Sequence, residues 1–194
     1  MKQIALATLA GAVVSFTWGF VSWMVLTWHR DEMKSFTDEA AVATVLRANA
    51  PTPGFYVMPG IPSLPKNARM DEIAAADEKH QQALNEGPVV YATVRPQPKI
   101  HDMNSNLINS FIRSVIAALL MGILLSMTSS LDYIQRVGFC ALVGLFVGVG
   151  MDAQQFVWFE APLRFTLVNV LDHIAEWLVS GFVIAGIVKG RDNF

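Results

Sequence analysis

The sequence predicts a membrane all-α bundle of four transmembrane helices with a small extracytoplasmic α/β insertion between the first helix and the second. Three observations predict this class. Of the 194 residues, 53% are hydrophobic and only 15% are charged, whereas soluble domains average roughly 25% charged residues. Four stretches are long and apolar enough to cross a hydrocarbon core of roughly 30 Å. More than half of the charged residues gather between these stretches, in residues 30–105.

The first predicted span covers residues 4–28 and contains no charged residue. A cleaved signal peptide is the alternative, because Lys2 precedes the apolar run. The run is too long for a signal peptide, and no small-residue cleavage site follows it, which favours a retained anchor. We therefore assign residues 1–29 to the first transmembrane segment, with Trp28 and His29 at the outer interface, where amphipathic rings accumulate.

Residues 30–105 are expected to form the extracytoplasmic insertion. Its predicted elements, each ended by proline or glycine, are a helix from Thr37-Asp38-Glu39 to Ala50, a strand over residues 55–58, a polar helix over residues 70–84 and a strand over residues 89–94. Two strands alone are marginally stable in water. Because the insertion has few apolar residues, we expect it to depend on the membrane helices or on a partner.

Residues 106–194 supply the other three spans, predicted over residues 106–127, 134–151 and 165–188. Ser129 and Asp132 resemble a capping box between the second span and the third, which predicts a tight antiparallel hairpin.

Basic residues in the short segments predict the orientation of the chain. An inside amino terminus places four of them on the cytoplasmic side: Lys2, Arg136, Lys189 and Arg191. The sequence therefore predicts a membrane protein with both termini in the cytoplasm and residues 30–105 outside it.

Polar residues in the last span form the most informative functional pattern. Helical spacing puts them on one face: Asn169, Asp172, His173, Glu176 and Ser180. An ionisable group inside a bilayer costs at least ~2.5 kcal/mol, so these groups are expected to face the bundle interior and find partners there. Arg113, in the second span, is the expected partner of Asp172 or Glu176. The cluster is either an interhelical ion pair that holds the bundle together or part of a proton or ion relay. The apolar residues 182–185 argue against a continuous pore within one chain.

Metal and haem sites are weaker interpretations. His173 and Glu176 have the spacing of shared metal ligands. His29, with Met33, and His101, with Met103, flank the outer ends of the first two spans, and His with Met suits copper. Interfacial histidines and surface methionines are the more common explanation, so the sequence predicts no cofactor. Cys140 is the single cysteine, so neither an internal disulfide nor a Cys-based metal site is possible.

Small residues recur every four positions in three of the spans. They are Ala7, Gly11, Ser15 and Gly19 in the first, Cys140, Gly144 and Gly148 in the third, and the pairs Gly181-Ala185 and Gly186-Gly190 in the fourth. Such faces allow close approach of helix backbones. They serve either packing within the bundle or docking to another membrane protein or a second copy. Three such faces exceed what one bundle requires, which favours a partner.

Catalytic signatures are absent from the sequence, so we expect no enzyme, and a net charge of −2 gives no indication of nucleic-acid binding. Several segments resemble a family of uncharacterised bacterial inner-membrane proteins: Trp18-Gly19, Trp23, Trp28-His29, residues 54–60 (GFYVMPG), and Asp172 with Glu176-Trp177. That family has no assigned activity, so the resemblance implies only a location, the bacterial inner (cytoplasmic) membrane.

Three functions follow as expectations. The first is a structural, accessory or assembly protein that contacts other membrane proteins through its helices and its insertion. The second is a small ion- or proton-coupled transporter that uses the intramembrane Arg113, Asp172, His173 and Glu176. The third is a metal- or haem-binding membrane protein.

Overall fold

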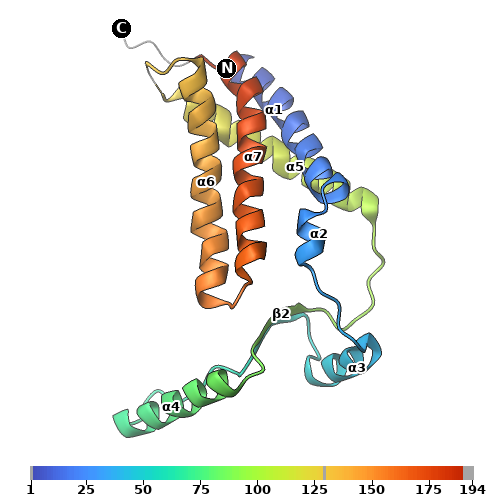
Figure 1. The fold of residues 1–194 in the computed structure, drawn as a ribbon, viewed down its shortest axis with the longest axis vertical. Coiled ribbons are helices and arrows are strands. Elements are labelled where there is room, and N and C mark those ends of the chain that lie inside the picture. Colours follow the sequence, from blue (N-terminus) through green and yellow to red (C-terminus); the bar gives the residue numbers. More distant parts are fainter. Residues whose placement is uncertain (1, 129, 190–194) are drawn as a thin grey trace. The chain divides into compact units, whose positions relative to one another are not determined.

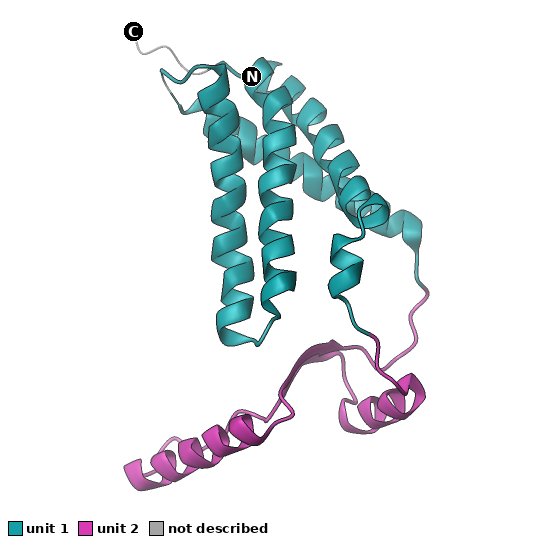
Figure 2. Cartoon of the chain, in the orientation of Figure 1, with its two compact units in different colours: residues 1–34, 101–194 teal, residues 35–100 magenta. Residues whose placement is uncertain are grey.

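The computed structural model describes residues 2–128 and 130–189 and is mostly helical (71%). The chain forms two compact units (Figure 2): unit 1 contains Met1–Lys34 and His101–Phe194, and unit 2 contains Ser35–Ile100. Residues 30–34 and 101–105, expected in the insertion, thus belong to unit 1. The predicted Ser129, Gly190 and Arg191 lie outside the described residues.

Within the described residues, four helical segments are long and apolar enough to cross a membrane, which confirms that prediction. They are Lys2–Val25 (α1 with a π-helical turn), Met103–Ser126 (α5), Tyr133–Trp158 (α6) and Leu163–Ile187 (α7). The third span continues well past residue 151, where the sequence analysis ended it, because Gln154 and Gln155 do not interrupt a helix.

The first span departs from the prediction at its end. The α-helix Lys2–Phe20 (α1) passes into a π-helical segment Val21–Val25 (η1), and a short helix, Trp28–Glu32 (α2), follows the break. His29 is 1% exposed and therefore packed inside the protein; its expected place at the outer interface stays a prediction. The turn at the break brings His29 onto α7.

Neighbouring spans of unit 1 run antiparallel (Figure 1). Helix α7 packs against both α6 and α1, and α1 packs against α5, whereas α5 and α6 hardly touch. Contacts along the helices define two ends of unit 1. The start of α1 and the start of α6 lie with the ends of α5 and α7, because Ile4 approaches Gly122 and Tyr133 bonds the Phe182 carbonyl. We call this the core end. The opposite end, with α2 and the α6–α7 connection, is the polar end.

Small residues bring the helices together inside the chain. A Cβ added at Gly144 would lie 2.4 Å from the His173 carbonyl oxygen, and one at Gly148 would lie 2.9 Å from the Cα of Val170. A Cβ at Gly11 would lie 2.6 Å from Ile184. These predicted packing positions therefore serve contacts within the bundle.

Gly19 differs from the other small residues of the packing face predicted for the first span. No described atom lies within 4 Å of a Cβ built there, whereas Ser15 is fully buried. The face therefore opens between Ser15 and Gly19, where the cavity described below begins.

The core end is filled by apolar side chains. The buried cluster consists of Ala7, Ala12, Ala118, Met121, Leu125, Val137, Cys140, Trp177, Ile184, Ala185 and Val188. Asp132 begins α6 as its N-cap, and its partner in the capping box is Gln135. The predicted pairing of Ser129 with Asp132 involves Ser129, which lies outside the described residues.

Unit 2 contains the four elements predicted for it. Helix Glu39–Asn49 (α3) is capped by Asp38, and strand Gly54–Met58 (β1) pairs antiparallel with strand Val90–Val94 (β2). Helix Met70–Glu86 (α4) ends at Gly87, whose φ of 59° favours glycine. Across unit 2, all of which the structure describes, the buried hydrophobic side chains are Ala50 and Val94.

Candidate functional site

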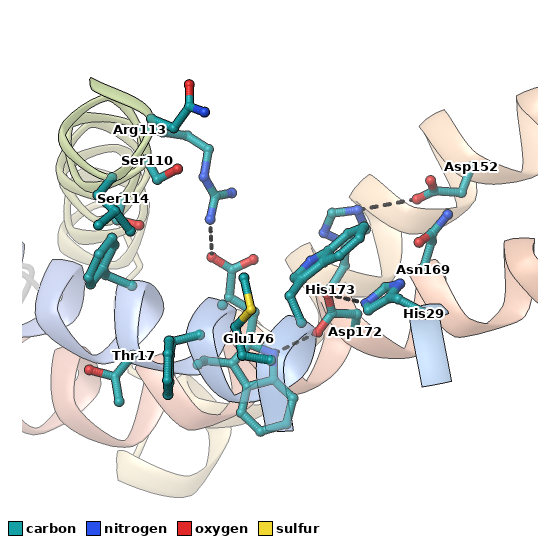
Figure 3. Close-up of a pocket in the computed structure, with 18 of the residues that line it drawn as sticks. Thr17, His29, Ser110, Arg113, Ser114, Asp152, Asn169, Asp172, His173 and Glu176 are labelled. Carbon is teal, nitrogen blue, oxygen red and sulfur yellow. Dashed lines mark hydrogen bonds and ion pairs between the residues drawn. The ribbon is translucent and has the colours of Figure 1, made fainter. Parts of the chain in front are cut away.

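A cavity of about 1020 Å³ lies in the polar half of unit 1, between α1, α2, α5 and α7 with one contribution from α6 (Figure 3). Its polar lining consists of Thr17, His29, Asn106, Ser110, Arg113, Ser114, Asp152, Asn169, Asp172, His173 and Glu176. Its apolar lining includes Phe16, Trp18, Phe20, Trp23, Met24, Met103, Leu107 and Phe165. The structure thus brings the predicted Arg113, Asn169, Asp172, His173 and Glu176 to one cavity.

Glu176 is the deepest carboxylate of the site and is 6% exposed. Its Oε1 accepts a hydrogen bond from Ser15 Oγ at 2.5 Å and another from Arg113 Nη2 at 3.1 Å. Ser15 Oγ also lies 3.2 Å from Ser114 Oγ. These contacts join α1, α5 and α7 around one buried charge, and burial of a charge requires such partners.

Arg113 makes only part of its possible contacts with Glu176. Its side chain is 57% exposed, and one nitrogen bonds the carboxylate. A guanidinium carries five N–H donors, so several of them remain available. Figure 3 shows Arg113 and Glu176 pointing toward one another from α5 and α7.

Asp172 receives hydrogen bonds from the first span. Trp18 Nε1 donates to Asp172 Oδ1 at 2.7 Å, and His29 Nε2 lies 3.1 Å from Asp172 Oδ2. The Trp23 ring stacks on His29 with ring centres 4.1 Å apart and planes 4° apart. The break after η1 therefore matters for the site, because it lets α2 fold back and present His29 to α7.

His29 keeps one ring nitrogen without a bond. Its Nε2 also lies 3.1 Å from Ser22 Oγ, whereas its buried Nδ1 has no hydrogen-bond partner among the described residues. If Nε2 donates to Asp172, then Nδ1 holds a bare lone pair. That nitrogen is a place where His29 can accept a proton.

A second histidine–carboxylate pair lies beside the first. His173 Nε2 and Asp152 Oδ2 are 3.2 Å apart, which is an ion-pair distance. That oxygen nevertheless accepts no well-aligned hydrogen bond from the described residues. The two groups therefore lie at ion-pair distance without a directed hydrogen bond, and they form an ion pair only when His173 is protonated.

The cavity has a surplus of acidic groups. Its lining contains one arginine, three carboxylates and two histidines. With both histidines neutral, the lining carries two excess negative charges, and protonation of both histidines removes the surplus. The charge of the site therefore follows the protonation of His29 and His173.

The structure does not gather the proposed metal ligands. His29 is bound to Asp172, and Met103 lines the cavity, but His101 is exposed and is not part of the lining. Within the part of the chain that the structure describes, no group of three or more His, Cys, Asp or Glu side chains is placed to hold a metal ion. His173 lies against Asp152 of α6, whereas Glu176 binds Ser15 and Arg113.

Several site residues were not predicted from the sequence. The contacts of Ser15, Trp18 and Ser114 cross between helices, and the folding back of His29 depends on the break after η1. A tryptophan within an apolar span was the available signal, because a buried indole N–H needs an acceptor. Ser180 was expected to continue the polar stripe, but it is fully buried and outside the cavity lining.

Comparisons of the chain with protein-family models, with curated proteins and with solved structures each found no match. No relative therefore supplies a function. The following argument rests on the chemistry and the geometry of the cavity.

Proposed function

We propose that the chain is a small proton-coupled membrane carrier whose substrate binds in this cavity. The observation that carries the proposal is the convergence of six ionisable side chains, from α2, α5, α6 and α7, on one cavity of about 1020 Å³. Ion pairs that only hold helices together need no adjoining empty volume. Ionisable groups within membrane helices are typical of proton relays and substrate pathways.

Proton coupling is supported by the two histidine–carboxylate pairs. His29 with Asp172 and His173 with Asp152 lie at 3.1 and 3.2 Å. Histidine is the side chain that ordinarily changes charge in the physiological range. A proton gained or lost at either pair changes the charge that a substrate in the cavity experiences.

The apolar core end supports a carrier and argues against an open channel. Leu125 and Ile184 are fully buried there, and a cluster of apolar side chains surrounds them. Water and ions therefore meet a packed barrier beyond Glu176. Carriers hold the substrate near the middle of the membrane and keep one end closed.

For the orientation, we propose that the core end faces the cytoplasm of a bacterium. Lys2, Arg136 and Lys189 flank that end, in agreement with the excess of basic residues in cytoplasmic segments. Unit 2 is then extracytoplasmic.

Proton-coupled flux in liposomes tests the proposal. The full chain is reconstituted with the pH-sensitive dye pyranine inside, a pH gradient is imposed, and a panel of cationic, anionic and neutral solutes is added. We expect one class of solute to dissipate the pH gradient, and we expect the variants Asp172→Asn and Glu176→Gln to abolish this solute-driven proton movement.

Asp132→Asn is the matched control, because it makes the same change at a helix cap outside the cavity, where Asn also serves. Size-exclusion profiles and circular dichroism confirm that each variant is folded. The carrier proposal is refuted if no solute moves protons through the folded protein, or if both cavity variants behave like the wild type.

A role as an accessory or assembly component is the second candidate, and unit 2 favours it. Large apolar side chains there are strongly exposed, with Ile61 at 78% and Ile100 at 90%. Exposed apolar surface outside a membrane marks contacts with other proteins. Crosslinking in mild detergent should then yield a defined complex or a homo-oligomer, whereas a clean monomer contradicts this role.

A further inference from the structure

We infer that the cavity takes a lipophilic organic cation, that is, an amine, quaternary ammonium or phosphonium ion with aromatic or aliphatic bulk. The inference rests on the proposed carrier function and names its substrate class. Three features of the lining carry it: the acidic surplus, the aromatic walls and the unpartnered nitrogen of His29.

The acidic surplus selects the sign of the charge. Arg113 is the one arginine of the lining and already binds Glu176 at 3.1 Å. Among the residues that the structure describes, the charged partners of Asp152 and Asp172 are histidines alone, so both carboxylates remain uncompensated when the histidines are neutral. Charges held a few ångströms apart at a protein surface interact several times more strongly than charges in bulk water. A cation in the cavity restores neutrality, whereas an anion adds to the surplus.

Aromatic side chains select a bulky and lipophilic ion. Five of them line the cavity: Phe16, Trp18, Phe20, Trp23 and Phe165. The faces of such rings attract cations, and tryptophan attracts them best. The hydrogen bond to Asp172 holds Trp18, and the stacking on His29 holds Trp23. Trp23 nevertheless remains 48% exposed, and Phe20 remains 58% exposed, so both have ring surface left for a ligand.

His29 links the cation to the proton. Protonation at its unpartnered Nδ1 makes the ring cationic, and the ring then neutralises Asp172 at 3.1 Å. When that proton leaves to water, Asp172 regains an uncompensated charge, which the organic cation can neutralise in its place.

The other charged groups that face this pair complete the exchange. They are Arg113 on α5, Asp152 on α6, and His173 and Glu176 on α7. Because Arg113 stays paired with Glu176, the cation that neutralises Asp172 replaces the single proton of His29. Cation and proton thus exclude each other, which is the requirement for antiport.

Equilibrium dialysis of tetraphenylphosphonium against the purified full chain tests the inference. We expect saturable binding that strengthens as the pH rises, as expected when one proton competes with one cation. Asp172→Asn should weaken binding tenfold or more and flatten the dependence on pH, whereas Asp132→Asn should change neither.

A pair of phenylalanines provides a second test that leaves the charged groups untouched. Phe20→Leu, in the lining, should weaken binding severalfold, whereas Phe146→Leu should have no effect, because Phe146 is 75% exposed on α6 outside the cavity. Equal binding by both variants overturns the aromatic part of the inference.

The outcomes separate this inference from the carrier proposal. If tetraphenylphosphonium does not bind, but a neutral or anionic solute releases the proton gradient through Asp172, then the substrate class is wrong and the carrier stands. If the cation binds with the expected dependence on pH, but no solute moves protons, then the cation site stands and the carrier is refuted.

Discussion

Helices α6 and α7 approach each other closely at Gly144, and a single methyl group there should separate the helices. A Cβ at Gly144 would lie 2.4 Å from the His173 carbonyl oxygen and 3.1 Å from the Cα of Ile174. Both atoms belong to the backbone, so no side chain can turn aside. Ordinary contact begins at 3.4 Å, so α7 must move by about 1 Å.

The energetic cost follows from that displacement. A gap of about 1 Å removes a quarter to a half of the dispersion energy of each contact along the interface, and overpacking of a close contact typically costs about 1–3 kcal/mol. The higher helix propensity of alanine relative to glycine offsets this cost by up to about 1 kcal/mol. We therefore expect Gly144→Ala to lower the free energy of unfolding by about 1–2 kcal/mol.

Gly138→Ala is the matched control on the same helix, because no described atom lies within 4 Å of a Cβ there. Unfolding by sodium dodecyl sulfate, followed by circular dichroism, measures both variants. Gly138→Ala should be neutral or stabilising. Because Gly144 contacts the backbone of His173, Gly144→Ala should also weaken tetraphenylphosphonium binding. Equal stability of the two variants would refute the account of the α6–α7 contact.

Three further predictions follow from contacts in unit 1. Arg113→Ala and Glu176→Gln, combined in a double-mutant cycle of unfolding, should show a coupling of about 0.6–1.7 kcal/mol, the range measured for polar contacts between membrane helices; additive effects would contradict their pairing. Ser15→Ala should destabilise the protein by about 1.5–3 kcal/mol in the same unfolding assay, because Glu176 loses a short hydrogen bond. The Ser105 hydroxyl and backbone amide, followed by the Asn104 amide, lower the pKa of Asp102. The ionised Asp102 should therefore stabilise the fold above the ordinary pKa of an aspartate, and this stabilisation should be lost as the pH falls through the lowered pKa. In a series of unfolding midpoints measured at different pH values, Asp102→Ala should remove this acid-range component.

The four apolar segments were predictable from the sequence because composition and length alone decide whether a helix suits a bilayer. The strands of unit 2 were predictable for a similar reason, since β-branched and aromatic residues between prolines leave few other structures. Such signals are local. They require no knowledge of which helix lies beside which.

The site depended on information that is not local. Helical spacing placed Asp172, His173 and Glu176 on one helix, and the cost of a buried charge required partners for them. It did not predict that η1 ends in a break that folds His29 back onto Asp172. Nor did it predict that Gly144 and Gly148 are used within the chain, because a small residue in a span has the same spacing whether its neighbour is α7 or another protein.

Water access to the cavity is the central claim, and a pair of serine-to-cysteine variants tests it most directly. Ser110 lines the cavity, whereas Ser180 is fully buried outside it, as is the native Cys140. The rate of modification by a charged methanethiosulfonate reagent is measured for Ser110→Cys and Ser180→Cys in liposomes. We expect rapid modification of the first variant, slowed by tetraphenylphosphonium, and no modification of the second. An unreactive Ser110→Cys, or equal rates for the two variants, would contradict a water-filled binding cavity.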